Sequence, residues 1–269
     1  MIPLSLVKFC IILGLNRLIL QPMPEYQHDK IVPFKDSDIP KKEQVAEMFN
    51  RIAYRYDFLN HFLSAGIDKS WRKKAIQELG SVKPHAILDV ATGTADMPVM
   101  MMKFLSPERI VGIDISEGML ELGKQKIAKA GLQKLIFLQT GDAEDIGFPD
   151  CSFDGISVSF GVRNFQNLER GLSEMYRVLK PGGKLVILEF SKPKKGIFLP
   201  FYSVYLRLIA PRIGKMFSGN AEAYKYLNES VNAFPEGNAL TGILDKTGYQ
   251  HTRFRKLSLG ICAIYSGIK

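Results

Sequence analysis

Residues 86–96 read AILDVATGTAD, and this stretch decides the fold. Residues 86–91 form a short apolar run, which is typical of a parallel strand that is buried on both faces. The small residues after it turn the chain into a helix, and such a turn lets a ligand approach backbone N–H groups closely. The stretch therefore predicts a ligand site at the carboxyl end of a strand in an α/β domain.

Strands and helices alternate after this turn. We expect helices at residues 97–104, from Ser116 to Gly131 and at 168–179, and strands at 109–113, 135–138, 153–160 and 184–190. This alternation predicts a doubly wound, mostly parallel sheet with helices on both faces. A last helix at 238–247 precedes strands at 249–257 and 261–265, which are close enough to form an antiparallel hairpin and complete a seven-stranded sheet.

The sequence before the first strand predicts N-terminal helices. Apolar residues follow helical spacing from Val45 to Ala53, in a helix that begins near Lys41. Residues 54–60 are aromatic and polar without a clear period, so we expect a structured loop there. A second helix is predicted at 68–79, with Gly80 as its C′ residue.

The composition is that of a globular protein with an excess of positive charge. The 269 residues suffice for one large α/β domain, and the formal net charge is +9 at pH 7. Such a charge is as typical of proteins that meet an anionic partner as of a general solubility charge. The three cysteines and four histidines show no ligand spacing, so we expect neither disulfides nor a metal, and a reducing cytoplasm fits best.

Asp96 bears on the chemistry of the ligand. It stands at the start of a predicted helix, where its carboxylate would repel a pyrophosphate, and the GxGxxG pattern of NAD-dependent oxidoreductases is absent. A carboxylate there suits a ligand with cationic groups and no phosphates, such as S-adenosylmethionine (SAM). The alternative is that Asp96 only caps the helix.

Acidic residues also close the next two strands. Asp114 ends the second strand, where its two oxygens suit the two hydroxyls of a ribose. Asp142 follows the third strand, where it would accept from the exocyclic amine of an adenine, and residues 157–161 would line the cofactor's edge. Each aspartate alone is also explained by an ordinary turn or strand end. Three acidic loops in sequence order favour a nucleoside cofactor, and we predict SAM.

Methylation of nucleic acid is the main competing function. Enzymes that methylate exocyclic base amines typically carry an [N/D]-P-P-[Y/F] signature after the fourth strand, whereas residues 159–164 read SFGVRN. Cys151 lies in a predicted turn before that strand, which makes it a poor candidate for the nucleophile of RNA carbon methylation. We therefore expect no nucleic-acid partner.

From residue 41 to residue 269 the chain resembles the ubiquinone/menaquinone biosynthesis C-methyltransferases. The discriminating segments are FGVRN at 160–164 and LEFSKP at 188–193, whereas RVLKPGG at 177–183 is common to many methyltransferases. Other matching segments are MFNRIA at 48–53, LDVATGT at 88–94, FPD at 148–150 and the tail at 260–269. The resemblance implies a class I SAM-dependent methyltransferase fold and methylation of a ring carbon on a prenylated quinol.

The resemblance also implies the site residues. Cofactor contacts fall on Thr94, Asp114, Asp142, Ala143 and Ser159. Catalytic roles fall on Arg163, which would stabilise a phenolate or orient a water that takes its proton, and on Asn164 and Tyr56, which would hold the quinol oxygens. Without the resemblance, an arginine beside a strand end is more often a salt-bridge partner.

One departure from the family pattern is structural. Ala95 replaces a glycine that most members have, so we expect the turn to avoid a positive φ there. The KKEQV opening at 41–45 favours the menaquinone pathway within the family, so we predict conversion of a demethylmenaquinol to a menaquinol. Two alternatives stay open: the equivalent C-methylation in ubiquinone biosynthesis, and a non-catalytic subunit of a quinone-biosynthesis assembly.

We divide the chain into an N-terminal helical cap (23–84) and a methyltransferase domain (85–269) with a helical insertion at 191–234. The insertion is basic and rich in aromatic residues, so it suits either contact with an anionic membrane and a prenyl tail or a plain cap over the pocket. We expect a cytoplasmic enzyme in peripheral contact with the inner face of the membrane, and we leave a homodimer open.

Residues 1–22 form an apolar extension of different composition. Lys8 and Arg17 interrupt it and no small-residue cleavage site follows, so it matches neither a secretory signal nor a membrane-spanning helix well. We expect the native protein to start at Met23, with a weak membrane-surface anchor as the alternative.

Overall fold

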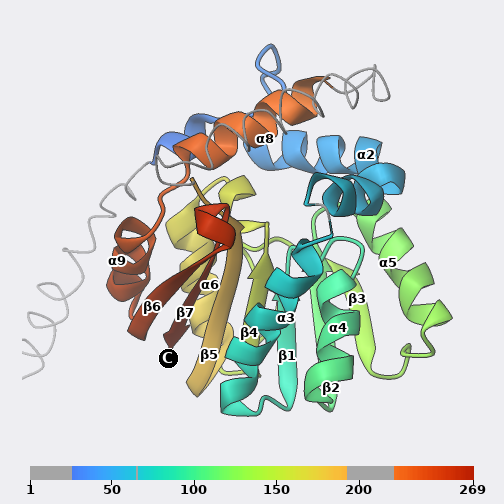
Figure 1. Cartoon of the computed structure of the whole chain (residues 1–269), viewed down its shortest axis with the longest axis vertical. Coiled ribbons are helices and arrows are strands. Elements are labelled where there is room, and N and C mark those ends of the chain that lie inside the picture. The colour runs from blue at the N-terminus through green and yellow to red at the C-terminus, as the bar shows by residue number, and fades with distance from the viewer. Residues whose placement is uncertain (1–25, 65, 193–220) are drawn as a thin grey trace, which may run out of the picture.

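The computed structural model describes residues 26–64, 66–192 and 221–269, and one seven-stranded sheet forms its centre (Figure 1). The strands are β1 (Ala86–Val90), β2 (Arg109–Asp114), β3 (Ile136–Thr140), β4 (Phe153–Ser159), β5 (Leu179–Phe190), β6 (Gln250–Leu257) and β7 (Cys262–Ile268). They stand in the order β3-β2-β1-β4-β5-β7-β6. Strands β1 to β5 run parallel, and β7 runs antiparallel between β5 and β6. The predicted doubly wound sheet with a C-terminal hairpin is therefore confirmed.

The strand order reverses beside β1. Leu88 pairs with Val111 of β2 on one side and with Ile156 of β4 on the other. In open α/β sheets, ligands bind in the crevice outside the carboxyl ends of the strands at such a point. The turn after β1, where the sequence predicted a ligand site, stands at this position.

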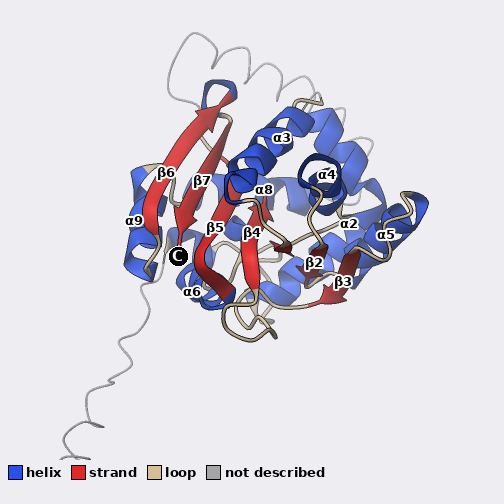
Figure 2. Cartoon of the chain, turned by 90° about the horizontal axis from the view of Figure 1, so that it is seen from below, coloured by secondary structure: helices blue, strands red, loops and turns tan. Residues whose placement is uncertain are grey.

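Helices cover both faces of the sheet (Figure 2). They are α2 (Lys41–Leu63), α3 (Asp68–Leu79), α4 (Asp96–Leu105), α5 (Glu117–Lys129), α6 (Leu168–Val178), α8 (Ala221–Ala233) and α9 (Asn238–Thr247), with short 3-10 helices at Gln27–Lys30, Gly80–Val82, Val162–Asn164 and Ser258–Gly260. Ile87 faces the cluster that contains Met101 of α4, whereas its neighbour Leu88 faces the cluster that contains Leu172 of α6. Successive strand residues point to opposite faces, so β1, β2 and β5 each supply both cores.

Helices α2 and α8 lie across the carboxyl ends of the strands and form what we call the roof (Figure 1). Val45 and Met48 of α2 pack against Tyr226 of α8 in a small apolar cluster of their own. The predicted loop at 54–60 is wrong, because α2 continues through these residues to Leu63. Residues 54–60 contain neither Pro nor Gly, so nothing in that stretch breaks a helix.

Two further local predictions are wrong. Gly80 has φ −61° and the chain continues as a 3-10 helix, whose end is the left-handed Lys83 (φ 47°). A Cβ at Gly80 would lie 2.6 Å from Leu105 Cδ2, so a larger residue there would require the Leu105 side chain to shift. Strand β5 begins at Leu179, before the expected turn, and residues 180–183 bulge out between the pairs that Leu179 and Lys184 make with β4.

The residues 1–22, with the predicted start at Met23, lie outside the described residues, as does most of the predicted insertion. Helix α8 falls within that insertion. No described helix combines the length and the hydropathy that a membrane crossing needs. The proposed division into a helical cap and a methyltransferase domain stays a prediction.

Candidate cofactor and substrate site

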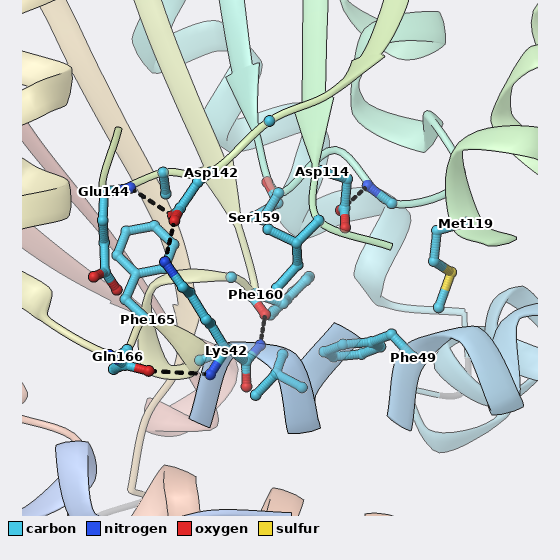
Figure 3. Close-up of a pocket in the computed structure, with 18 of the residues that line it drawn as sticks. Lys42, Phe49, Asp114, Met119, Asp142, Glu144, Ser159, Phe160, Phe165 and Gln166 are labelled. Atoms are coloured by element: carbon cyan, nitrogen blue, oxygen red, sulfur yellow. Dashed lines mark hydrogen bonds and ion pairs between the residues drawn. The ribbon is translucent and has the colours of Figure 1, made fainter. Parts of the chain in front are cut away.

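A pocket opens at the carboxyl ends of β1 to β4, beneath α2 (Figure 3). The empty space between its walls is about 660 Å³, a figure that includes open solvent at the mouth. Its wall consists of Lys42, Val45, Phe49, Tyr56, Ala91, Gly93, Asp114, Ile115, Met119, Gly141, Asp142, Ala143, Glu144, Ser159, Phe160, Gly161, Asn164, Phe165 and Gln166. The loops at the strand ends supply Asp114, Asp142, Glu144 and Ser159 to the wall, whereas α2 supplies Val45, Phe49 and Tyr56 together with Lys42.

Hydrogen bonds to Asp89 stabilise the turn after β1. This fully buried carboxylate accepts from Thr92 Oγ1 at 2.7 Å and from the Ser157 hydroxyl. Burial raises the pKa of the Asp89 carboxyl to about 6. The residue therefore shapes the turn and is not itself part of the pocket wall.

The backbone of this turn corrects the expectation for Ala95. Its φ is 64°, so an alanine occupies the left-handed region that glycine adopts at no steric cost. The Ala95 N–H donates to the Thr92 carbonyl at 3.1 Å, and the side chain is fully buried. The turn therefore takes a positive φ at Ala95 although alanine has a Cβ, which is contrary to the expectation from the sequence.

Asp114 lies at the centre of the strand-side wall. One carboxylate oxygen accepts from the Gly93 N–H at 2.8 Å, and the other accepts from the Ser116 N–H at 2.9 Å. Burial raises the pKa of this carboxyl, and the backbone N–H groups oppose that shift. Each oxygen retains a lone pair, so Asp114 can accept two more hydrogen bonds from a diol such as a ribose.

A second acidic group lies in the loop after β3. Lys42 Nζ reaches down from α2 and donates to Asp142 at 3.0 Å, as Figure 3 shows, which raises the pKa of Lys42. The other Asp142 oxygen accepts from the Glu144 N–H at 2.9 Å. Glu144 is mostly buried and accepts from the Asn167 N–H, and burial raises the pKa of its carboxyl. Ala143 lies between these two carboxylates in the pocket wall.

One hydroxyl in the wall has no hydrogen-bond partner in the part of the chain that the structure describes. Ser159 Oγ is buried and forms no hydrogen bond with any described residue. A buried polar group normally has a partner, so this hydroxyl is suited to a ligand. Together with the acceptors of Asp114 and Asp142 and the open turn at Gly93, it fits a ribonucleoside with a polar tail, as SAM is.

The roof supplies the apolar half of the pocket. Phe49 projects from α2 on the side of the pocket where Met119 and Phe160 lie (Figure 3), and Val45 of the same helix also lines the pocket. Tyr56, one of the predicted catalytic residues, lies edge-on to Phe49 with ring centroids 5.7 Å apart. This side of the pocket suits a flat aromatic molecule.

Helix α2 is also fastened to the N-terminus of α5. Asn50 Oδ1 accepts from the Ser116 hydroxyl at 2.7 Å and from the Gly118 N–H at 2.9 Å. Gly118 must be small, because a Cβ there would lie 3.1 Å from the same oxygen. Since Ser116 also donates its N–H to Asp114, Asn50 links the roof to the predicted ribose acceptor.

Two residues singled out in the sequence lie outside the pocket wall. Lys126 Nζ donates to Thr94 Oγ1 at 3.1 Å and forms an ion pair with Asp96 at 2.5 Å. Arg72 lies 3.9 Å from the other Asp96 oxygen. The Asp96 carboxylate faces these two cations, and its contact with the ligand stays a prediction. Any contact of Thr94 with the cofactor stays a prediction.

The predicted catalytic residues Arg163 and Asn164 have different positions relative to the pocket. Asn164 lines the pocket, whereas Arg163 does not. Arg163 is buried, with its guanidinium 2.7 Å from Glu189 and also donating to the Phe160 carbonyl. The guanidinium thus has the salt-bridge arrangement that was the alternative interpretation of the sequence.

Several wall residues were missed by sequence reasoning. Lys42, Phe49 and Glu144 lie within segments that were quoted for other reasons, at 41–45, 48–53 and in the loop of Asp142. Their side chains could not be assigned without knowing that α2 folds over the strand ends. Of the predicted set, Tyr56, Asp114, Asp142, Ala143, Ser159 and Asn164 are brought together around one pocket.

Known proteins resemble this chain over most of its length. It is 44% identical over 244 residues to the demethylmenaquinone methyltransferase of Bacteroides fragilis, covering 91% of this chain and 99% of that protein. It is 46% identical over 230 residues to the ubiquinone/menaquinone biosynthesis C-methyltransferase UbiE of Geotalea daltonii, covering 85% and 97%. Among solved structures, a SAM-dependent methyltransferase from Aquifex aeolicus shares the fold at a TM-score of 0.54, with 20% identity and coverage of 74% and 89%.

The model of the ubiE/COQ5 methyltransferase family matches residues 38–269. That range includes every strand of the sheet and the whole pocket wall. The match confirms the resemblance seen in the sequence, and the class I SAM-dependent methyltransferase fold agrees with it. The chain belongs to the ubiE/COQ5 methyltransferase family.

Proposed function

We propose that this chain transfers a methyl group from SAM to a ring carbon of demethylmenaquinol and so produces menaquinol. The observation that carries the proposal is the two-sided pocket, with acidic acceptors on the strand side and aromatic side chains on the roof side. The names of relatives that share 42–46% of their residues with the chain support the same activity.

The strand side would hold the cofactor. Asp114 would accept from the ribose, Asp142 from the adenine amine, and the Ser159 hydroxyl would gain the partner that it lacks among described residues. When bound, SAM supplies an electrophilic methyl group on its sulfonium. A carboxylate-lined site without a phosphate-binding loop favours this cofactor over a dinucleotide.

The roof side would hold the quinol ring. A ring carbon becomes nucleophilic when the neighbouring hydroxyl loses its proton, so the protein must place the ring close to the methyl group and favour the phenolate. Phe49 and Phe160 can pack against the ring, while Asn164 and Tyr56 hold its oxygens. Arg163 would act through Glu189 and the Phe160 carbonyl by fixing the loop that carries Asn164.

A direct assay tests this proposal. The purified chain is incubated with methyl-labelled SAM and either demethylmenaquinol or the prenylated benzoquinol of the ubiquinone pathway, and the products are identified by mass spectrometry. We expect labelled menaquinol. A preference for the benzoquinol of more than tenfold would move the assignment to ubiquinone biosynthesis, and no labelled product from either quinol would favour a non-catalytic subunit.

We also propose peripheral contact with an anionic membrane, from which a prenylated quinol would enter. Helix α2 carries Tyr54, which is 88% exposed, between the exposed Arg51 and Arg55. An exposed aromatic ring flanked by cations is typical of a membrane interface. Sedimentation with anionic but not zwitterionic vesicles, reduced by Tyr54→Ser, is the expected result. A homodimer stays a prediction.

A further inference from the structure

The side-chain amide of Asn164 is held from two sides by the protein. Its oxygen accepts from the hydroxyl of Tyr226 at 3.1 Å, and its nitrogen donates to the Phe160 carbonyl at 3.4 Å. Tyr226 belongs to α8 and is 3% exposed, packed with Val45 and Met48 of α2. A residue sixty-two positions away in the sequence therefore touches a side chain of the pocket wall.

These two contacts determine which way the amide faces. A backbone carbonyl can only accept, so the nitrogen of Asn164 must be the end that meets Phe160. The oxygen must then face Tyr226, and the tyrosine hydroxyl must be the donor. Burial raises the pKa of Tyr226 above its usual range, which keeps that hydroxyl protonated and able to donate.

One N–H of the amide then has no partner among the described residues. Because Asn164 lines the pocket, this N–H is the group that its side chain can offer to a ligand. The charged groups that act on Tyr226 are Arg163 and Glu189, which pair with each other, and Lys41 acts on Arg163 from α2. None of them takes the place of the amide donor in the pocket wall.

We propose that Tyr226 is a positioning residue that makes Asn164 present an N–H donor to the quinol oxygen. The inference rests on the proposed function. The quinol oxygen gains negative charge as its proton leaves, so a donor stabilises it and an acceptor repels it. Without the tyrosine hydroxyl the amide keeps only its contact with the Phe160 carbonyl, so its free N–H is held less firmly toward the quinol oxygen and stabilises the phenolate less.

The test compares two conservative substitutions in the full chain. Tyr226→Phe removes the hydroxyl and keeps the ring in its apolar cluster. Tyr249→Phe is the matched control, because the buried Tyr249 donates to the Leu172 carbonyl at 3.3 Å and is not part of the pocket wall. We expect the single-turnover rate of Tyr226→Phe to fall by about tenfold or more, with S-adenosylhomocysteine (SAH) affinity unchanged, and Tyr249→Phe to keep its rate.

The pH profile separates this role from a general structural one. If the amide donor favours the phenolate, its loss raises the pKa of the bound quinol, so the acid limb of the kcat profile moves to higher pH in Tyr226→Phe. The rate deficit should therefore shrink in alkaline solution. A packing defect would instead lower the rate by the same factor at every pH.

A second variant keeps the test independent of Tyr226. Asn164→Asp retains the acceptor for the tyrosine hydroxyl but replaces the N–H with a charged oxygen, so it should be slower than Asn164→Ala. Tyr226→Phe should have no further effect on the rate in the Asn164→Ala background. Normal rates and an unmoved acid limb in Tyr226→Phe would overturn the inference alone. Failure of the wild-type chain to methylate either quinol would overturn the proposed function and the inference with it.

Discussion

Arg163 Nη1 lies 2.7 Å from Glu189 Oε1, and both side chains are buried beside the pocket. Glu189 also accepts from the Phe190 N–H, so the pair joins the end of β5 to the segment that carries Asn164. Burial raises the pKa of the Glu189 carboxyl, and the Arg163 guanidinium opposes that shift. The contact explains why an arginine is needed next to a pocket that its guanidinium does not line.

Arg163→Ala should therefore destabilise the protein more than it slows the chemistry. It leaves a buried carboxylate without its cation, and breaking such a pair typically costs about 3–5 kcal/mol of the free energy of unfolding. Thermal melts, SAH titration and single-turnover rates on one preparation measure the three effects. Arg163→Met combined with Glu189→Gln should recover most of the stability. If that double variant is stable yet slower by more than about a hundredfold, Arg163 contributes to the chemistry beyond the stability of its ion pair.

Asp114→Asn should weaken cofactor binding as much as Asp114→Ala does. From the sequence alone the amide looks tolerable, because it keeps one acceptor oxygen. In the structure both oxygens accept from backbone N–H groups, so the NH₂ of asparagine would face either Gly93 or Ser116 as a second donor. We expect SAH affinity to fall by about 1–3 kcal/mol in calorimetry. Asp150→Asn, at an exposed ion pair with Arg177, is the control, and affinity within twofold of wild type in Asp114→Asn contradicts this prediction.

Asn50→Ala should loosen the roof and weaken cofactor binding together. The change removes the acceptor for Ser116 and Gly118 at the start of α5, and the loss of a capping acceptor typically costs about 1 kcal/mol. Asn50→Asp keeps the acceptor and places a favourable negative charge at the helix N-terminus, so it should behave like wild type. Limited proteolysis of α2 and SAH calorimetry provide the measurements. Asn232→Ala serves as the control, because the exposed Asn232 donates to Asn228 on its own helix α8. Equal behaviour of the alanine and aspartate variants would refute the link.

Asp89 should make stability depend on pH in an unusual direction. Its pKa is about 6 in the folded protein, against 3.8 for the ordinary group, because it is buried. Between pH 3.8 and pH 6 this carboxyl is therefore protonated in the folded state and ionised in the unfolded state. Its contribution to the free energy of unfolding is fully present below pH 3.8 and is lost as the pH rises through 6. The loss amounts to about 3 kcal/mol at pH 7.

Asp89→Asn removes this titration and keeps the side chain's shape. The difference in unfolding free energy between the variant and wild type should grow in the variant's favour from pH 4 to pH 7. Urea denaturation at several pH values measures it, with Asp150→Asn as an exposed control. A difference that stays constant with pH would show that Asp89 does not titrate in this range.

Local patterns were sufficient to predict the sheet. Short apolar runs separated by helical periods specify buried parallel strands, and their alternation leaves few arrangements other than a doubly wound sheet. The acidic residues Asp114 and Asp142 could be placed in the pocket for the same reason, because parallel strands bring their carboxyl ends to one edge. The order of parallel strands alone makes their carboxyl ends neighbours, whatever the side chains are.

The roof could not be predicted in this way. Helix α2 lies far from β3 in the sequence, and only its packing over the strand ends brings Lys42 to Asp142 and Asn50 to Gly118. The directions of Arg163 and Asp96 are decided by partners in other elements, Glu189 and Lys126, because buried charges must find opposite charges wherever the fold puts them. Local sequence therefore specified the strands and the chemistry at their ends. Tertiary packing decided which side chains face the pocket. The ion pairs and the packing of α2 and α8 over the strand ends join residues far apart in the sequence, so local periodicity cannot predict them.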